Sequence, residues 1–429
     1  MRPRIVVDDA IAWHREAFDP LGELRALPGS AIDRAALMQA DVLVVRTVTR
    51  VTAELLEGTP VRFVGTATAG EDHVDRVALE RRGITVARAP GCNAQAVAEY
   101  VVSVLAHARR WDAATLPGPV GVVRLGHVGR RTTRALRALG YDVLACDPPL
   151  AERRAAGVKT EDPDPGLTTM ARFERLRAFE ELLATANVIT LHVPLERGRS
   201  HPTWHMADAG ILSRLKQGQL VINTCRGGVI DDAALERWLA EGLGHAVLDV
   251  WEGEPRPRAG LVRPGPQGIR LGTPHVAGYS LEGKVAATRM VYEALCRWLK
   301  RTPDFDGRAV LGAPGSIVLR CYDKEAPHDW RPWIEAAVPL LPDDTALRAA
   351  VSKPDDERGV AFEALRRRYV LRRELSAFKI ERHVDLDPET HQRLAALGIA
   401  VPPEPTAPSR MVRSRSSISY AAALPTESR

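Results

Sequence analysis

Three residues whose types suit hydride-transfer chemistry follow successive apolar runs of the chain. Arg226 lies in V-I-N-T-C-R-G-G, Glu254 in L-D-V-W-E-G-E-P and His275 in G-T-P-H-V-A-G-Y. Oxidation of a 2-hydroxy acid needs a cation to hold the carboxylate, a base to take the hydroxyl proton, and a carboxylate that strengthens that base. An arginine, a histidine and a glutamate at the ends of successive strands could supply these three functions.

Each of these residues also has an ordinary structural interpretation. An isolated histidine is more often a surface or core residue than a base, and Glu254, which precedes Pro255, could simply cap a turn. All three residues follow apolar runs in this way, and their joint occurrence favours a catalytic role over a purely structural one. We therefore predict Arg226, Glu254 and His275 as catalytic residues.

Short apolar runs alternate with helical patterns through the first 95 residues. Helices are expected at 33–40 and 74–82. The expected strands are Ile5–Val7, Val42–Val45, Phe63–Gly65 and Thr85–Ala87. Repeated strand–helix units imply a parallel sheet, whose strands end in polar turns that can hold ligands.

A second strand–helix series follows a long helical pattern at 93–109. It opens with G-V-V-R-L-G-H-V-G at 121–129. The strands expected after it are Val143–Cys146, Val188–Val193, Leu220–Asn223, Ala246–Asp249 and Ile269–Leu271. This series is typical of a doubly wound dinucleotide-binding domain. The fold class is therefore predicted as α/β, with two Rossmann-like, doubly wound parallel-sheet domains.

The glycine-rich turn of this second series departs from the expected G-x-G-x-x-G pattern. Arg124 stands where the first glycine is expected, whereas Gly126 and Gly129 are present. With His127 and Val128, these glycines can bring backbone N–H groups to a pyrophosphate at a helix N-terminus. The first glycine often has a conformation that is costly for a residue with a Cβ. Three outcomes stay open: the guanidinium meets a phosphate, cofactor affinity falls, or the chain is a decayed or mis-sequenced copy.

Asp147 follows the strand-like run V-L-A-C. A carboxylate at this position can accept hydrogen bonds from the adenosine ribose and would repel a 2′-phosphate, which favours NAD over NADP as the cofactor. Alternatively, Asp147 only forms the turn before Pro148 and Pro149.

Several sequence motifs of the chain resemble those of the D-isomer-specific 2-hydroxyacid dehydrogenase family. G-T-A-T-A-G-E-D-H-V-D at 65–75, A-P-G-C-N-A at 89–94 and L-D-V-W-E-G-E-P carry this resemblance. H-V-A-G-Y-S-L-E-G-K at 275–284, together with D-D-T-A-L-R and Y-V-L-R-R-E near the C-terminus, is similar to one branch whose members act on a phosphorylated hydroxy acid. The resemblance extends from about residue 4 to about residue 383.

The resemblance implies NAD-dependent oxidation of a phosphorylated 2-hydroxy acid, with His275 as the base, Glu254 as its partner and Arg226 on the carboxylate. The cofactor contacts that it implies, besides Arg226, the glycine-rich turn and Asp147, are Val193, Thr224, Cys225, Asp249 and Gly278. Val193 replaces a Thr or Ser that is frequent in the family. The implied substrate contacts are Thr47, Thr68, Tyr279 and, for the phosphate, Arg46, with Arg88 as a weaker candidate.

Two other functions stay open. The chain could be a phosphoglycerate- or glyoxylate-type dehydrogenase of the same family. It could also be a non-catalytic NAD-binding pseudoenzyme, which Arg124 and Val193 would suit.

The expected domains are a discontinuous substrate-binding domain (1–95 and 282–300) and an NAD-binding domain (96–281). The resemblance adds an α+β dimerisation domain at 301–383, and hence a homodimer. The remainder, 384–429, is expected to be a partly disordered tail, because Pro, Ser and Arg dominate it from residue 402.

The composition of the chain argues against several other classes of protein. The net charge of +5 is attributed to an arginine-rich bias and to attraction of an anionic substrate, because no basic–aromatic interleaving typical of nucleic-acid binding accompanies it. The five cysteines include no CxxC pair, so neither a metal site nor a disulfide framework is expected. No apolar run has the length of a membrane span, and the N-terminus lacks a secretory signal, so the cytoplasm is expected.

Overall fold

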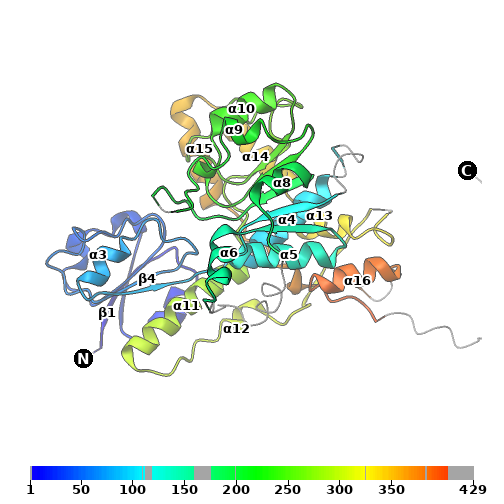
Figure 1. The fold of residues 1–429 in the computed structure, drawn as a ribbon. Helices are drawn as coiled ribbons and strands as arrows, with labels where there is room; N and C mark the ends of the chain where they lie inside the picture. Colours follow the sequence, from blue (N-terminus) through cyan, green and yellow to red (C-terminus); the bar gives the residue numbers. More distant parts are fainter. Residues whose placement is uncertain are drawn as a thin grey trace, which may run out of the picture.

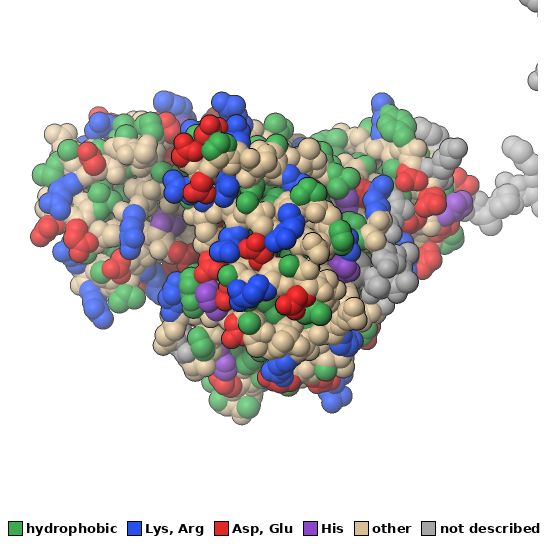
Figure 2. Space-filling model, turned by 90° about the horizontal axis from the view of Figure 1, so that it is seen from above, with side chains coloured by type: hydrophobic (Ala, Val, Ile, Leu, Met, Phe, Trp, Pro, Cys, Tyr) green, Lys and Arg blue, Asp and Glu red, His purple; other side chains and the backbone are tan. Residues whose placement is uncertain are grey.

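The computed structural model describes residues 2–108, 110–111, 118–158, 175–198, 200–323, 325–381 and 384–403. It contains two large parallel sheets that form two lobes, each with helices packed against its sheet (Figure 1). This arrangement confirms the predicted α/β class. On the face shown in Figure 2, Lys and Arg side chains lie among Asp and Glu side chains and form no single continuous patch.

The first sheet has five parallel strands in the order β2-β1-β3-β4-β5. The strands are β1 (Arg4–Asp8), β2 (Glu23–Leu27), β3 (Val42–Val45), β4 (Phe63–Thr66) and β5 (Thr85–Arg88). Its short helices are α1 (His14–Phe18), α2 (Arg34–Leu37) and α3 (Arg76–Arg81). The four predicted strands are confirmed. β2 was not predicted, because this edge strand reads E-L-R-A-L and carries no continuous apolar run.

The second sheet has six parallel strands in the order β11-β10-β9-β8-β6-β7. The strands are β6 (Val120–Val123), β7 (Val143–Cys146), β8 (Val188–Leu191), β9 (Leu220–Asn223), β10 (His245–Leu248) and β11 (Leu271–Gly272). The helices are α5 (His127–Ala138), α6 (Pro148–Ala155), α8 (Phe179–Thr185), α9 (Ala209–Leu212) and α10 (Asp232–Ala240). Because β6 pairs with both β7 and β8, the strand order reverses there. Such a reversal opens a crevice at the carboxyl ends of the strands, where dinucleotides bind.

Two long helices connect the lobes. α4 (Ala94–Ala108) leaves the first sheet and is buried along almost its whole length. α11 (Leu281–Leu299) returns from the second lobe, and its Val291, Tyr292 and Leu295 share a core with β1, β3 and β4. The approach is close enough that a Cβ on Gly65 of β4 would lie 2.4 Å from Val291 Cγ1. α11 therefore packs against the first sheet.

The C-terminal segment packs on the second lobe. It contains α12 (Arg308–Leu311), β12 (Ile317–Val318), α13 (Arg331–Ala337), α14 (Leu341–Val351), α15 (Asp355–Arg367), β13 (Phe378–Lys379) and α16 (Pro388–Ala396). Trp330 and Trp333 share one apolar core with α4 and β6, and Leu347 and Phe362 share another with β10. The segment thus extends the core of the second lobe.

α15 ends at Arg367, after which the chain extends and Arg372 forms a β-bridge with Ser280. In the described part of the expected tail, α16 and the chain after it bury Leu394 and Ile399 against the second lobe. The expected disorder at 404–429 concerns positions outside the described residues. No described helix combines the length and apolar character needed to cross a membrane.

Candidate active site

A cavity of about 780 Å³ lies between the two lobes. Arg226, Glu254 and His275 all line it. They follow β9, β10 and β11, which are neighbours in the second sheet. Because parallel strands end at the same edge of a sheet, three turns that are distant in sequence deliver these side chains to one place. The structure therefore brings together the three predicted catalytic residues.

His275 and Glu254 form a hydrogen-bonded pair at the cavity. His275 Nδ1 lies 2.8 Å from Glu254 Oε2. About a third of the His275 side chain and a fifth of the Glu254 side chain remain exposed. Burial opposes ionisation of Glu254, but the hydrogen bond and positive charge of His275, with a further bond from Trp251 N–H, lower its pKa below the usual value.

Asp249 holds the turn that carries His275. Its Oδ1 accepts hydrogen bonds from Thr273 Oγ1 (2.6 Å) and Val276 N (2.7 Å), and its Oδ2 accepts one from Ala277 N (3.0 Å). His275 itself has a left-handed backbone, with φ of 59°. A conformation of this kind persists only where neighbouring groups fix it. Asp249, predicted as a cofactor contact, therefore anchors the catalytic turn in this structure.

Arg226 connects the two lobes. Its Nε donates to Oδ2 of Asp72, in the first domain, at 3.0 Å, and its Nη1 donates to the carbonyl of Cys225. A Cβ on Gly70 would lie 2.1 Å from Arg226 Nη2, so the first domain approaches this guanidinium through a glycine. Arg226 thus reaches the cavity from the second lobe while it is held by the first.

The glycine-rich turn explains the sequence anomaly in structural terms. Arg124 has a φ of 77°, in the left-handed region that glycine adopts most easily. Gly126 precedes the first residue of α5, and a Cβ on Gly129 would lie 1.9 Å from the carbonyl oxygen of Arg124. The turn therefore keeps the shape of a pyrophosphate cradle at the N-terminus of α5, which begins with His127 and Val128, although Arg124 occupies the position of its first glycine.

Asp147, at the end of β7, has both carboxylate oxygens engaged by backbone. Oδ2 accepts from Leu125 N at 2.9 Å, and Oδ1 accepts from Leu150 N at 3.0 Å as the N-cap of α6. The turn-forming alternative is therefore present in the structure. The hydrogen bond from Leu125 N also ties the Asp147 carboxylate directly to the glycine-rich turn.

Other predicted cofactor residues gather at the carboxyl ends of β8 and β9. Val193 is buried there, and the hydroxyl oxygen of Thr224 is buried with no hydrogen-bond partner among the described residues. An orphaned buried hydroxyl is costly unless a ligand satisfies it, so these residues fit a dinucleotide. Cys225 Sγ donates to Asn223 Oδ1, and burial raises the pKa of its thiol to about 11.

The predicted substrate residues lie on the same cavity. Thr47, Thr68, Tyr279 and Arg46 line it, together with Gly278 from the cofactor set. The Thr68 hydroxyl donates to the carbonyl of Gly70 at 2.7 Å, so it also shapes the loop that approaches Arg226. Arg88 is the exception: it forms an ion pair with Glu71 at 3.1 Å and lies outside the cavity, so this weaker phosphate candidate is wrong.

The cavity also contains residues that the sequence analysis did not single out, among them His73, Lys284 and Arg366. Lys284 closes the quoted motif H-V-A-G-Y-S-L-E-G-K, whose similarity to one branch was a usable signal. Arg366 belongs to an R-R-R run that was counted only as bulk charge. Within the described ranges, no group of three or more His, Cys, Asp or Glu side chains could hold a metal ion.

Comparisons with known proteins agree with this geometry. Residues 107–277 match the family model described as D-isomer specific 2-hydroxyacid dehydrogenase, NAD binding domain. Erythronate-4-phosphate dehydrogenase from Escherichia coli O1:K1 / APEC is 40% identical over 385 residues, which covers 88% of this chain and 93% of the relative. The Escherichia fergusonii enzyme of the same name is 39% identical over the same extent.

Solved structures support the fold. D-lactate dehydrogenase from Aquifex aeolicus, complexed with NAD and lactic acid, matches with a TM-score of 0.54 at 23% identity, over 69% of this chain and 95% of that chain. Sequence similarity along most of the chain and a shared fold lead to one conclusion: the chain belongs to the erythronate-4-phosphate dehydrogenases, within the D-isomer-specific 2-hydroxyacid dehydrogenase family.

Proposed function

We propose that the protein oxidises C2 of 4-phospho-D-erythronate to give 2-oxo-3-hydroxy-4-phosphobutanoate, with NAD⁺, in pyridoxal 5′-phosphate biosynthesis. The observation that carries this proposal is the His275–Glu254 pair, which opens onto the same cavity as Arg226. A base with its carboxylate and a carboxylate-binding cation meet where a small hydroxy acid can enter.

His275 acts as the base of this reaction. Its Nδ1 is engaged by Glu254, which leaves Nε2 to take the proton from the C2 hydroxyl. The adjacent carboxylate favours the imidazolium that forms. NAD⁺, when bound, supplies the acceptor for the hydride that leaves C2. Proton and hydride together account for the two-electron oxidation of the alcohol to a ketone.

Arg226 binds the substrate carboxylate and stabilises charge at the C2 oxygen. A guanidinium suits both tasks, because its planar fork can donate to two oxygens at once. Thr47, Thr68 and Tyr279 line the same cavity and contribute hydroxyl groups to the substrate. Arg46 is the residue that the sequence suggested as a hydrogen-bond donor to the substrate phosphate.

The cofactor is held by the second lobe. The turn formed by Gly126, His127, Val128 and Gly129 cradles the pyrophosphate, and Asp147 stands at the end of the next strand, where the ribose would lie. The orphaned hydroxyl of Thr224 supports a contact from the end of β9. Val193, Cys225, Asp249 and Gly278 complete the proposed cofactor set. A carboxylate beside the ribose favours NAD over NADP.

A homodimer formed through the C-terminal segment is part of this proposal. Large apolar side chains are exposed in that segment, namely Tyr322, Leu341, Val360 and Val370. Exposed apolar groups of this kind suit burial against a second copy. The five cysteines are free thiols, which suits the reducing cytoplasm.

The test is turnover of 4-phospho-D-erythronate by purified protein, with NAD⁺ and a 2-oxo acid to reoxidise any retained NADH. Activity that disappears in His275→Ala supports the proposal. Turnover of 3-phosphoglycerate or glycolate in its place would favour another dehydrogenase of the family. No turnover of any of these by the protein or its Arg124→Gly variant would favour the pseudoenzyme.

A further inference from the structure

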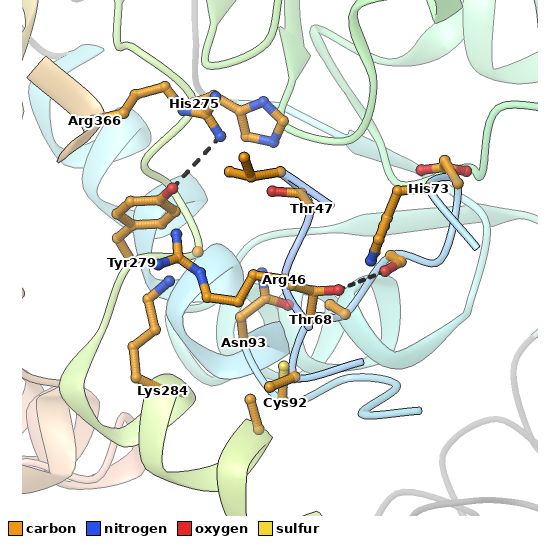
Figure 3. A pocket seen from close by; sticks show the side chains of 18 of the residues that line it. Arg46, Thr47, Thr68, His73, Cys92, Asn93, His275, Tyr279, Lys284 and Arg366 are labelled. Carbon is orange, nitrogen blue, oxygen red and sulfur yellow. Dashed lines mark hydrogen bonds between the residues drawn. The ribbon is translucent and has the colours of Figure 1, made fainter. Parts of the chain in front are cut away.

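Three cationic side chains converge on one side of the cavity, from three separate parts of the chain. Arg46 follows β3, Lys284 lies in the first turn of α11, and Arg366 lies in the last turn of α15. Figure 3 shows these side chains around Tyr279, with Thr68 and His73 across the cavity. Arg366 therefore brings the C-terminal segment into the substrate site.

Tyr279 sits at the centre of this cluster. Lys284 Nζ lies 4.1 Å from the centroid of its ring, and Arg366 Nη2 lies 3.5 Å from its hydroxyl oxygen. Arg366 Nε is buried without a hydrogen-bond partner among the described residues. The Nε–H group of this guanidinium is thus buried and still able to donate a hydrogen bond to a ligand.

The acidic groups of the cavity are mostly engaged elsewhere. Asp72 pairs with Arg226 and Glu254 with His275, which leaves Glu363 beside Arg366 Nη1 at 3.3 Å. Across the described parts of the chain, neither Arg46 nor Lys284 forms an ion pair with a carboxylate. Arg46, Lys284 and Arg366 therefore have one neighbouring carboxylate among them, and Arg50 adds a further positive charge to the cavity lining.

This imbalance is visible in the titration of Lys284. Burial and the positive charges of Arg46 and Arg366 lower the pKa of its ammonium group to about 8, and Cys92 opposes the shift. Like charges held together in a partly buried cluster are unfavourable until an anion joins them. The cluster is therefore arranged for a ligand that carries negative charge.

We infer that Arg46, Lys284 and Arg366 form the subsite that binds the phosphate of the substrate, an inference that rests on the proposed function. The substrate has an anionic group at each end, and the proposed function places the substrate carboxylate at Arg226. A phosphate dianion has acceptor oxygens enough for two guanidinium groups and one ammonium group. The hydroxyl of Tyr279 lies within reach of the same oxygens.

The experiment compares kcat/KM for 4-phospho-D-erythronate with kcat/KM for D-erythronate in Lys284→Gln and Arg366→Gln. Each variant is expected to lose about 10- to 100-fold on the phosphorylated acid, as for one lost charge-assisted hydrogen bond, and to change little on the unphosphorylated acid. Lys284→Arg is expected to recover most of the loss. An equal loss on both acids would overturn the subsite.

Two neighbouring arginines provide matched controls. Arg289 on α11 pairs with Glu293 at the surface, and Arg367 follows Arg366 on α15 but does not line the cavity. Arg289→Gln and Arg367→Gln should preserve the preference for the phosphorylated acid. A loss in these controls as large as in the test variants would overturn the assignment, because general charge would then explain it.

Direct anion binding separates this inference from the proposed function. Sulfate and inorganic phosphate, titrated calorimetrically into the full chain, should bind the wild type and bind Lys284→Gln and Arg366→Gln at least tenfold more weakly. That result would support the anion subsite even if the wild type failed to oxidise 4-phospho-D-erythronate, which would defeat the proposed function alone. Equal binding by wild type and variants would overturn the subsite even in an active enzyme.

Discussion

His275 Nδ1 lies 2.8 Å from Glu254 Oε2, although 21 residues separate them in the chain. The two residues end separate strand–turn units, and the buried Asp249 fixes the turn that carries His275. The protein's own groups therefore position the ring, with one nitrogen engaged and the other left for the substrate. Preorganisation of this kind is what a general base needs.

Replacement of His275 by alanine should remove the proton acceptor and leave the cofactor cradle intact. We expect turnover to fall by about 10²- to 10⁴-fold, the usual contribution of a general base. The Kd for NADH, followed by its fluorescence, should stay within about threefold of wild type, since no cradle residue changes. Undiminished turnover would rule out this role.

Glu254→Gln should move the acid limb of the pH dependence of kcat/KM to lower pH. The pKa of Glu254 is lowered despite its burial, chiefly by His275, so the side chain is an anion throughout the working range. A neutral amide no longer favours the imidazolium form of the base. An acid limb that coincides with that of the wild type would contradict the pairing.

Asp72→Asn should lower KM for the hydroxy acid. Asp72 holds Arg226 Nε at 3.0 Å, so it competes with the substrate carboxylate for the same guanidinium. Two thirds of the Asp72 side chain is exposed, so the pair is weak and the expected fall in KM is only about two- to fivefold. Asp19→Asn, a change at an exposed residue of the first domain that does not line the cavity, serves as the control. A higher KM in Asp72→Asn would show that Asp72 supports Arg226.

Arg124→Gly should raise the melting temperature of the protein without cofactor. A φ of 77° costs a residue with a Cβ on the order of 1–2 kcal/mol, part of which the greater chain entropy of glycine offsets. The net gain corresponds to roughly 1–4 °C. Arg124→Ala removes the charge and keeps the strained backbone, so it should bring no gain. Equal melting temperatures in all three proteins would show that the turn accepts arginine without strain.

The affinity for NADH in the same variants decides between the alternatives for Arg124. Weaker binding in both Arg124→Gly and Arg124→Ala would mean that the guanidinium contacts a phosphate. Tighter binding in Arg124→Gly would mean that the arginine weakens the cofactor site.

Sulfate affinity should decrease as the pH rises through about 8. Lys284 has its pKa lowered to about 8, so it is a cation below that pH and neutral above it. Sulfate keeps a constant charge over this range and therefore reports the protein alone. In Lys284→Arg the affinity should stay flat to pH 10, because a guanidinium remains charged. A wild-type profile equally flat would exclude Lys284 from the site.

Local patterns in the sequence were sufficient to predict most strands of the two large sheets. Continuous apolar runs such as V-L-V-V and L-V-I-N predicted buried parallel strands, and the polar residues just after them predicted the catalytic positions. The same reasoning missed β2, whose mixed E-L-R-A-L pattern reflects an edge position that only the folded sheet defines.

Contacts between distant segments could not be read in this way. Arg366 lies 87 residues from Tyr279 in the chain, and nothing in the R-R-R run indicates which of its members turns inward. Arg88 is the last residue of β5 and Arg46 directly follows β3, but Arg88 pairs with Glu71 and lies outside the cavity. The choice between a solvated charge and a ligand contact depends on how α15 packs, which is a property of the tertiary structure.

The chain passes between the lobes at α4, at α11, and again after α11, where the C-terminal segment returns to the second lobe. These crossings limit how the lobes can move: they allow rotation about a hinge, but they oppose separation of the lobes. Arg46 belongs to the first lobe, whereas Arg226 and Arg366 belong to the second with its C-terminal segment. Under the proposed function, a substrate bound at both of its ends would fasten one lobe to the other. Its binding would then favour the closed arrangement of the lobes, and a hydroxy acid that lacks one anionic end would favour it less.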